Sequence, residues 1–171
     1  SIFDYWSIPS LVRWLSRDAA ASGHLLASER QLRDRYADVL RAMSHPAIAN
    51  GHAVFLNHAN RNNPDFGRLD GETTSGRSIF AFWRVDEGSR RAVLVVANLH
   101  RTKAAQNLEI EVPPEAWVGM RASSADPANL IFSPLLTADS PMVDVDPSRP
   151  TMLAIGPVPP LTTHYWEVTL P

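Results

Sequence analysis

The spacing of apolar residues along this 171-residue chain changes character near residue 51. Before that point the spacing is helical. Five apolar residues fall on one face of a 3.6-residue period: Leu32, Tyr36, Val39, Leu40 and Met43. Ser28 and Gln31 match a capping box, and Pro46 ends the pattern. The pattern therefore predicts a helix over 28–45.

After residue 51 the apolar runs are short and bounded by turn residues. The run 106–112 alternates between apolar and polar residues, which is typical of strands. The run 78–85 is also interpreted as a strand, with one face of Ile79, Ala81, Trp83 and Val85 and another of Phe80, Phe82 and Arg84. The run 91–99 is apolar almost throughout, which predicts a central strand covered on both faces. Eight strand segments are expected in all: 52–58, 78–85, 91–99, 106–112, 129–133, 141–146, 151–158 and 164–170.

We therefore expect a mainly β chain with a helical lead-in: an antiparallel Greek-key β-sandwich over 51–171, preceded by a helical part over 1–50. A second, shorter helix is predicted over 7–16, where Ser7 is a suitable N-cap. The chain opens on bulky apolar residues, whereas most termini are polar. We expect from this that the native polypeptide continues upstream of Ser1.

Composition narrows the classes of partner. The chain is 44% hydrophobic and 20% charged, which is ordinary for a globular protein, and its net charge is −2. This charge gives no electrostatic reason to expect a nucleic acid or a membrane surface as partner. No apolar run approaches the length of a membrane span. The chain has no Cys, which excludes disulfides and thiol catalysis but leaves the compartment open.

Carboxylates and histidines show no arrangement typical of catalysis or metal binding. Glu109 and Glu111 are expected to point outward from one strand. Asp144 and Asp146 share a strand face and offer oxygens to Ca²⁺, but solvated turn carboxylates are the favoured interpretation. Six histidines lack the spacing of a metal pair and are interpreted as structural or surface residues: His24, His45, His52, His58, His100 and His164.

The segment 60–73 is rich in oxygen donors, which suggests Ca²⁺. It lacks the residue order of an EF-hand, so a plain flexible loop is the favoured interpretation. The chain also lacks a nucleophile elbow, a phosphate-binding loop and a dinucleotide fingerprint. The residues alone therefore point to no catalytic set.

Five Trp and three Tyr raise the question of sugar binding, because exposed aromatic rings stack on pyranose rings. Trp83 and Trp166 lie among apolar neighbours in predicted strands and are expected in the core. Trp117 follows two prolines and is expected to cap a turn. Tyr5 and Trp6 lie in the irregular opening, where packing in a core or interface is favoured over sugar binding.

The order of these elements resembles the C-terminal part of the α-amylase superfamily, glycoside hydrolase family 13. The segment "LRDRYADVLRAMSHPAIANG" resembles the last helix of the catalytic barrel and the short segment after it. The segment "SIFAFWRVDEGSRRAVLVVANLHRTKAAQNLEIEV" is similar to the family's C-terminal β-domain, although Leu99 stands where Phe is usual. The closing 141–170 fits the tail of that domain, and 1–16 looks like the segment after the eighth barrel strand.

The resemblance implies that the helices of 1–50 derive from the end of a (β/α)₈ barrel. The catalytic Asp and Glu residues of such enzymes would lie upstream of Ser1, so no catalytic residue is expected in this chain. The chain alone should be inactive, while the parent would act on α-glucosidic linkages by a retaining two-carboxylate mechanism. Asp4, Tyr5 and Trp6 are candidate substrate-binding residues at the rim of the parent's active site.

The partners implied are the N-terminal catalytic barrel and, through it, an α-glucan or oligosaccharide. No cofactor is expected in this chain, and Ca²⁺ is implied only as an option for the parent. The apolar face of the helix over 28–45 also offers a surface for homo-oligomers. The alternative function is a free-standing carbohydrate-binding β-sandwich.

Overall fold

The computed structural model of the chain describes residues 27–69, 71–120, 129–136 and 140–170. The chain divides into two compact units between Met43 and Ser44. Among the described residues, the first unit holds helix α2 (Ala27–Met43), and the second holds two short helices and eight strands. The helix predicted over 7–16 and the candidate residues Asp4, Tyr5 and Trp6 lie outside the described residues.

Helix α2 confirms the predicted helix with shifted ends. It begins at Ala27, so Ser28 lies inside the first turn instead of capping it. It ends at Met43 because His45 adopts an extended backbone, with φ −60° and ψ 132°, as a residue before proline favours. The five apolar residues of its predicted face are between 40% and 68% exposed.

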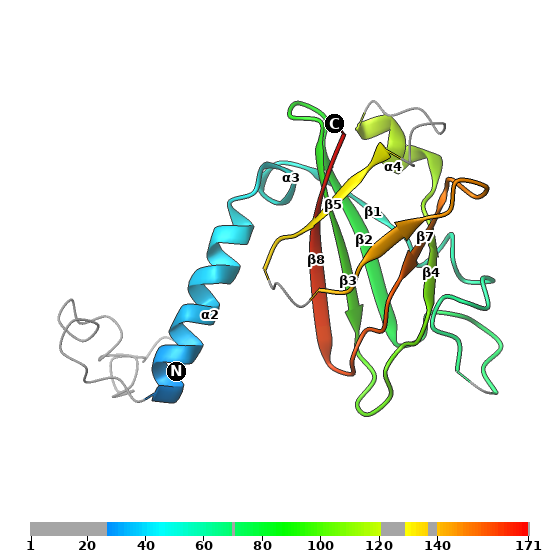
Figure 1. Cartoon of the computed structure of the whole chain (residues 1–171), viewed down its shortest axis with the longest axis horizontal. Coiled ribbons are helices and arrows are strands. Elements are labelled where there is room, and N and C mark those ends of the chain that lie inside the picture. The colour runs from blue at the N-terminus through cyan, green and yellow to red at the C-terminus, as the bar shows by residue number, and fades with distance from the viewer. Residues whose placement is uncertain (1–26, 70, 121–128, 137–139, 171) are drawn as a thin grey trace, which may run out of the picture. The chain divides into compact units, whose positions relative to one another are not determined.

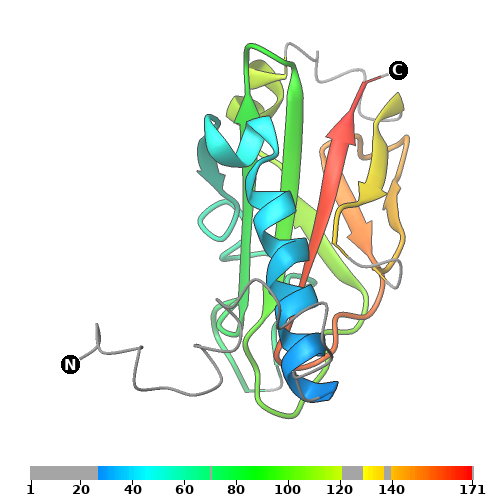
Figure 2. The same ribbon diagram turned by 90° about the vertical axis from the view of Figure 1, so that its left-hand side faces the viewer.

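The larger sheet is antiparallel and has the strand order β1-β2-β3-β8-β5 (Figure 1). Its strands are β1 (His52–Phe55), β2 (Ile79–Asp86), β3 (Arg91–Asn98), β8 (Thr162–Thr169) and β5 (Ile131–Pro134). Figure 2 turns this sheet toward the viewer, with β8 in red beside β5 in yellow. Strand β3 is the middle of the five.

The smaller sheet is also antiparallel and has the order β4-β7-β6. Its strands are β4 (Leu108–Glu111), β7 (Met152–Ile155) and β6 (Val143–Val145). Each of the eight predicted segments overlaps one strand, so the prediction of a mainly β, antiparallel domain is confirmed. The structure also contains two short helices, α3 (Pro46–Ala49) and α4 (Pro114–Gly119), that the pattern did not predict.

Residues of both sheets contribute to one hydrophobic core, in which three tryptophans are the largest side chains. Trp83 and Trp166 are buried, as predicted. Trp117 is also buried, because α4 carries it into the core, where its ring meets Trp83 edge-on at 5.3 Å between centroids. Its indole N–H donates to the Val112 carbonyl at 3.1 Å, so burial leaves no unpaired donor there. The prediction of a turn cap at Trp117 missed this role.

Strand β3 is buried on both faces, as its continuous apolar run predicts. Leu94 faces the main core, whereas Val93 and Val95 belong to a second cluster on the outer face of the sheet. Helix α3 covers part of that face with Ala47 and Ile48. The two faces of β3 are therefore covered by different elements.

Helix α3 is attached to the outer face by polar contacts. His45 caps the helix, because its Nδ1 accepts the Ala47 N–H at 3.2 Å. That role leaves the ring proton on Nε2, which donates to Glu167 Oε1 at 3.1 Å. Arg91 donates to the same oxygen. Burial raises the pKa of Glu167, but the hydrogen bonds from His45 and Arg91 outweigh burial and hold that pKa below its ordinary value.

We predict that Glu167→Gln lowers the free energy of unfolding by about 1–3 kcal/mol at pH 7, because the charge-assisted bonds to Arg91 and His45 are lost. A carboxyl whose pKa is depressed in the folded state stabilises above its unfolded pKa, which is near 4.5. The difference from wild type should therefore shrink as pH falls below that value. Urea unfolding from pH 7 to pH 3 measures it.

The matched control is Glu111→Gln, because the Glu111 side chain is exposed. This variant should differ from wild type by less than about 0.5 kcal/mol. A gap between wild type and Glu167→Gln that stays constant down to pH 3 would contradict the assignment.

Candidate functional site

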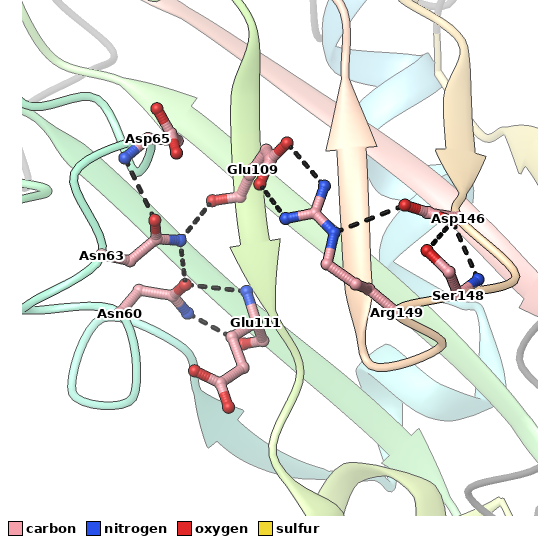
Figure 3. Close-up of polar contacts among 8 residues, drawn as sticks. All are labelled: Asn60, Asn63, Asp65, Glu109, Glu111, Asp146, Ser148 and Arg149. Carbon is pink, nitrogen blue, oxygen red and sulfur yellow. Dashed lines mark hydrogen bonds and ion pairs between the residues drawn. The ribbon is translucent and has the colours of Figure 1, made fainter.

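Strand β4 lies at the edge of the smaller sheet, and asparagine side chains from the segment between β1 and β2 pair with that edge (Figure 3). Asn60 is fully buried. Its Oδ1 accepts the Glu111 N–H at 2.7 Å, and its Nδ2 donates to the Glu111 carbonyl at 2.8 Å and the Leu56 carbonyl at 2.9 Å. One side chain thus pairs both backbone groups of Glu111, as a neighbouring strand would.

The same pairing continues along β4. Asn63 Nδ2 donates to the Glu109 carbonyl at 3.0 Å and to Asn60 Oδ1 at 3.1 Å, and the Glu109 N–H donates to the Asp65 carbonyl at 3.0 Å. Phe66, which is fully buried, anchors the segment to the core. The loop is irregular, as predicted, but its first half is tied to β4 and the core, which a plain flexible loop would not be.

These contacts also bear on the Ca²⁺ alternative. The side-chain oxygens of Asn60 and Asn63 both accept N–H groups, the latter from Asp65 at 3.0 Å. No group of three or more His, Asp or Glu residues within the described ranges is arranged to hold a metal ion. The side-chain oxygens of Asn60 and Asn63 are thus already used in holding the segment together and against β4.

The carboxylates near β4 and β6 are joined by one cation (Figure 3). Arg149 donates to both oxygens of Glu109, at 2.9 and 3.0 Å, and to Asp146 at 3.4 Å. Hydrogen bonds from the Ser148 hydroxyl and backbone lower the pKa of Asp146, and the bond to Glu109 raises the pKa of Arg149. Glu109 and Asp146 are thus both held by Arg149, which does not suit an acid–base pair.

Two histidines are buried among the described residues. His45 caps α3, as given above, while His164 lies on β8 and its Nδ1 is 3.3 Å from the Ser140 hydroxyl. Burial lowers the pKa of His164, so its ring is neutral at pH 7. Both agree with a structural interpretation, and His52 and His58 are exposed.

Three phenylalanines form an exposed cluster on the outer face of the larger sheet, which we call the outer aromatic patch: Phe55, Phe80 and Phe82. Phe55 pairs with Phe82 across β1 and β2, and Phe80 lies two residues before Phe82 on the same face. The ring centroids are 5.5 to 6.4 Å apart. Phe55 is 59% and Phe80 is 41% exposed.

The outer aromatic patch lies beside the part of the outer face that helix α3 covers. Phe82 still packs against the cluster under α3, whereas Phe55 and Phe80 extend beyond it. The outward positions of a strand in a two-sheet domain are normally polar, and contiguous exposed apolar groups mark interaction sites. The sequence carries a signal of this patch, because aromatic residues occupy both faces of 78–85.

Comparison with known proteins yields no match to a family model, to a curated protein or to a solved structure. Among the described residues, no helix has the length and apolar character needed to cross a membrane. Function therefore has to be inferred from the β-rich fold, the outer aromatic patch and the polar groups around β4.

We predict that Asn60→Ala lowers the free energy of unfolding by about 2–4 kcal/mol, because buried groups of Glu111 and Leu56 lose their partners. Asn62→Ala is the matched control, since Asn62 is an exposed asparagine of the same segment, and it should change stability by less than about 0.5 kcal/mol. Urea unfolding compares the two. Equal effects of the two substitutions would contradict the pairing role of Asn60.

Proposed function

We propose that this chain is the non-catalytic C-terminal domain of an α-amylase-like glycoside hydrolase, and that it stabilises the catalytic barrel by docking through the outer aromatic patch. The observation that carries the proposal is the patch itself. Phe55 and Phe80 hold aromatic rings in water on a sheet face whose other half is already covered by α3. Such a surface gains stability when a partner covers it.

The order of elements supports the same assignment. A helix with an exposed apolar face, α2, is followed by the short α3 and then by the β-domain, which is the order of the family resemblance. In this proposal α2 is the last barrel helix. In this proposal the two sheets form a Greek-key sandwich. The strand order supports this, because β8 pairs with β3 only after the chain has formed the strands of the smaller sheet.

The ring geometry favours protein packing over the alternative of a free-standing carbohydrate-binding module. The rings of the outer aromatic patch are tilted by 39° to 57° to one another. Rings that stack on a sugar chain present a flat surface, whereas tilted rings leave hollows that side chains of a protein partner fill. We therefore assign the patch to the barrel and retain sugar binding as an outcome of the test.

In this proposal the parent cleaves or transfers α-glucosidic linkages by a retaining mechanism with two carboxylates, both on the barrel. Asp4, Tyr5 and Trp6 contribute to the rim of its active site. In this proposal the chain stabilises the barrel and takes no part in catalysis, because its Glu109 and Asp146 carboxylates are bound to Arg149. No metal or cofactor is needed for that role.

In the test, the barrel that this proposal places upstream in the same gene is expressed as a separate polypeptide. We predict that the barrel binds this chain, and that Phe80→Ser and Phe55→Ser each weaken binding at least tenfold, because central aromatic anchors carry most of an interface's energy. Titration calorimetry measures the affinity, and maltooligosaccharide hydrolysis should require the barrel.

Val118→Ser is the matched control, because Val118 is 72% exposed on α4, outside the patch. It should bind the barrel like wild type. The proposal is contradicted if the upstream reading frame encodes no barrel strands and none of the catalytic Asp and Glu residues. Retention of the isolated chain on starch, lost in Phe80→Ser, would favour the carbohydrate-binding alternative instead.

A further inference from the structure

A pocket of about 360 Å³ lies on the β-domain, and its lining includes no residue of the outer aromatic patch. Its walls come from the segment 64–69 on one side and from 98–107 on the other, with Ser78 and Ile79 between them. Pockets of about 300–1,000 Å³ are typical of small-molecule sites. The pocket is therefore larger than a bare inorganic ion requires.

The wall formed by 98–107 is held by side-chain hydrogen bonds. Asn98 donates to the Lys103 carbonyl at 2.9 Å and the Val158 carbonyl at 3.0 Å, and its Oδ1 accepts the His100 N–H at 2.9 Å. His100 Nδ1 in turn accepts the N–H groups of Thr102 and Lys103. A neutral His100 therefore carries its proton on Nε2, which is left as a donor.

The opposite wall is held by packing. Phe66 is buried, and Gly67 adopts a positive φ of 60° directly over Ile79, where a Cβ would approach the Ile79 side chain to 2.5 Å. Arg68 is oriented by the Ser75 hydroxyl, which accepts from Nε at 2.9 Å. Both walls are thus positioned before any ligand binds, which lowers the entropic cost of binding.

The pocket combines cationic donors with a single carboxylate. Arg68 and Lys103 contribute basic side chains, whereas the chain as a whole has a net charge of −2. No hydrogen bond or ion pair engages the Lys103 ammonium within the part of the chain that the structure describes. No hydrogen bond or ion pair engages the Asp65 carboxylate among the described residues, while the Asp65 N–H donates to Asn63 (Figure 3) and the Asp65 carbonyl accepts the Glu109 N–H. Gln106 and Asn107 add amides.

We propose that this pocket binds a small polyhydroxylated oxyanion, meaning a phosphorylated or carboxylated monosaccharide. Arg68, Lys103 and His100 Nε2 donate to the oxyanion, as guanidinium, ammonium and imidazole N–H groups do in charge-assisted bonds. The Asp65 carboxylate accepts from hydroxyl groups of the same ligand. Leu69, Ile79 and Ala105 supply an apolar surface for its C–H groups.

The experiment is a titration of the full chain with glucose 6-phosphate, glucuronate, glucose and inorganic phosphate, followed by calorimetry and by amide NMR shifts. We expect one of the two acids to bind at a single site, at least tenfold more tightly than glucose or phosphate. The acid that binds identifies the oxyanion. Lys103→Gln should weaken that binding about tenfold, in line with loss of one charged hydrogen bond.

Lys103 is exposed, so its substitution leaves the fold intact, and equal thermal stability of the variant verifies this. Asp65→Asn should weaken binding of the acid sugar while leaving phosphate binding unchanged. Arg61→Gln is the control, because Arg61 is an exposed arginine of the same segment that does not line the pocket. The proposal is overturned if neither acid binds, if phosphate binds as tightly, or if Arg61→Gln weakens binding as much as Lys103→Gln.

Discussion

Strand β3 has to be buried on both faces, and the other elements of the second unit are arranged around it. Its seven residues after Arg91 are buried, so one face needs the second sheet and the other needs a separate cover. The smaller sheet and α4 cover the face of β3 that points into the core, and Trp83, Trp117 and Trp166 fill the space between. Helix α3 covers the outer face only in part. The outer aromatic patch is the part of that face which the chain leaves to a partner in our proposal.

The polar contacts follow from the same arrangement. Helix α3 is only four residues long, too short to be stable alone, and His45, Arg84 and Gly51 fix it to the sheet. Arg84 donates to the Ala47 and Gly51 carbonyls, while a Cβ on Gly51 would meet the Ala47 oxygen at 2.3 Å. At the smaller sheet, Asn60 and Asn63 satisfy the edge of β4 and deny it to a second chain.

Periodicity was sufficient to predict the strands, because the residues that face the core recur at every second position of a strand, as in Ile79, Ala81 and Trp83. It was insufficient for α4, whose six residues are fewer than two helical turns and follow two prolines. Asn60 was not predictable either, because its partner Glu111 is 51 residues away. The patch was visible in the sequence as Phe80 and Phe82, but only the exposure of Phe55 and Phe80 in the structure shows that the second unit leaves part of it uncovered.

The central claim is that the outer aromatic patch is an interface within a larger enzyme. Carbene footprinting of the intact gene product, set beside the isolated chain, tests it most directly, because the label reports the solvent exposure of each side chain. The account predicts that Phe55 and Phe80 are labelled in the isolated chain and protected in the intact product, while exposed Val118 is labelled equally in both. Equal labelling of Phe55 and Phe80 in the two samples would contradict it.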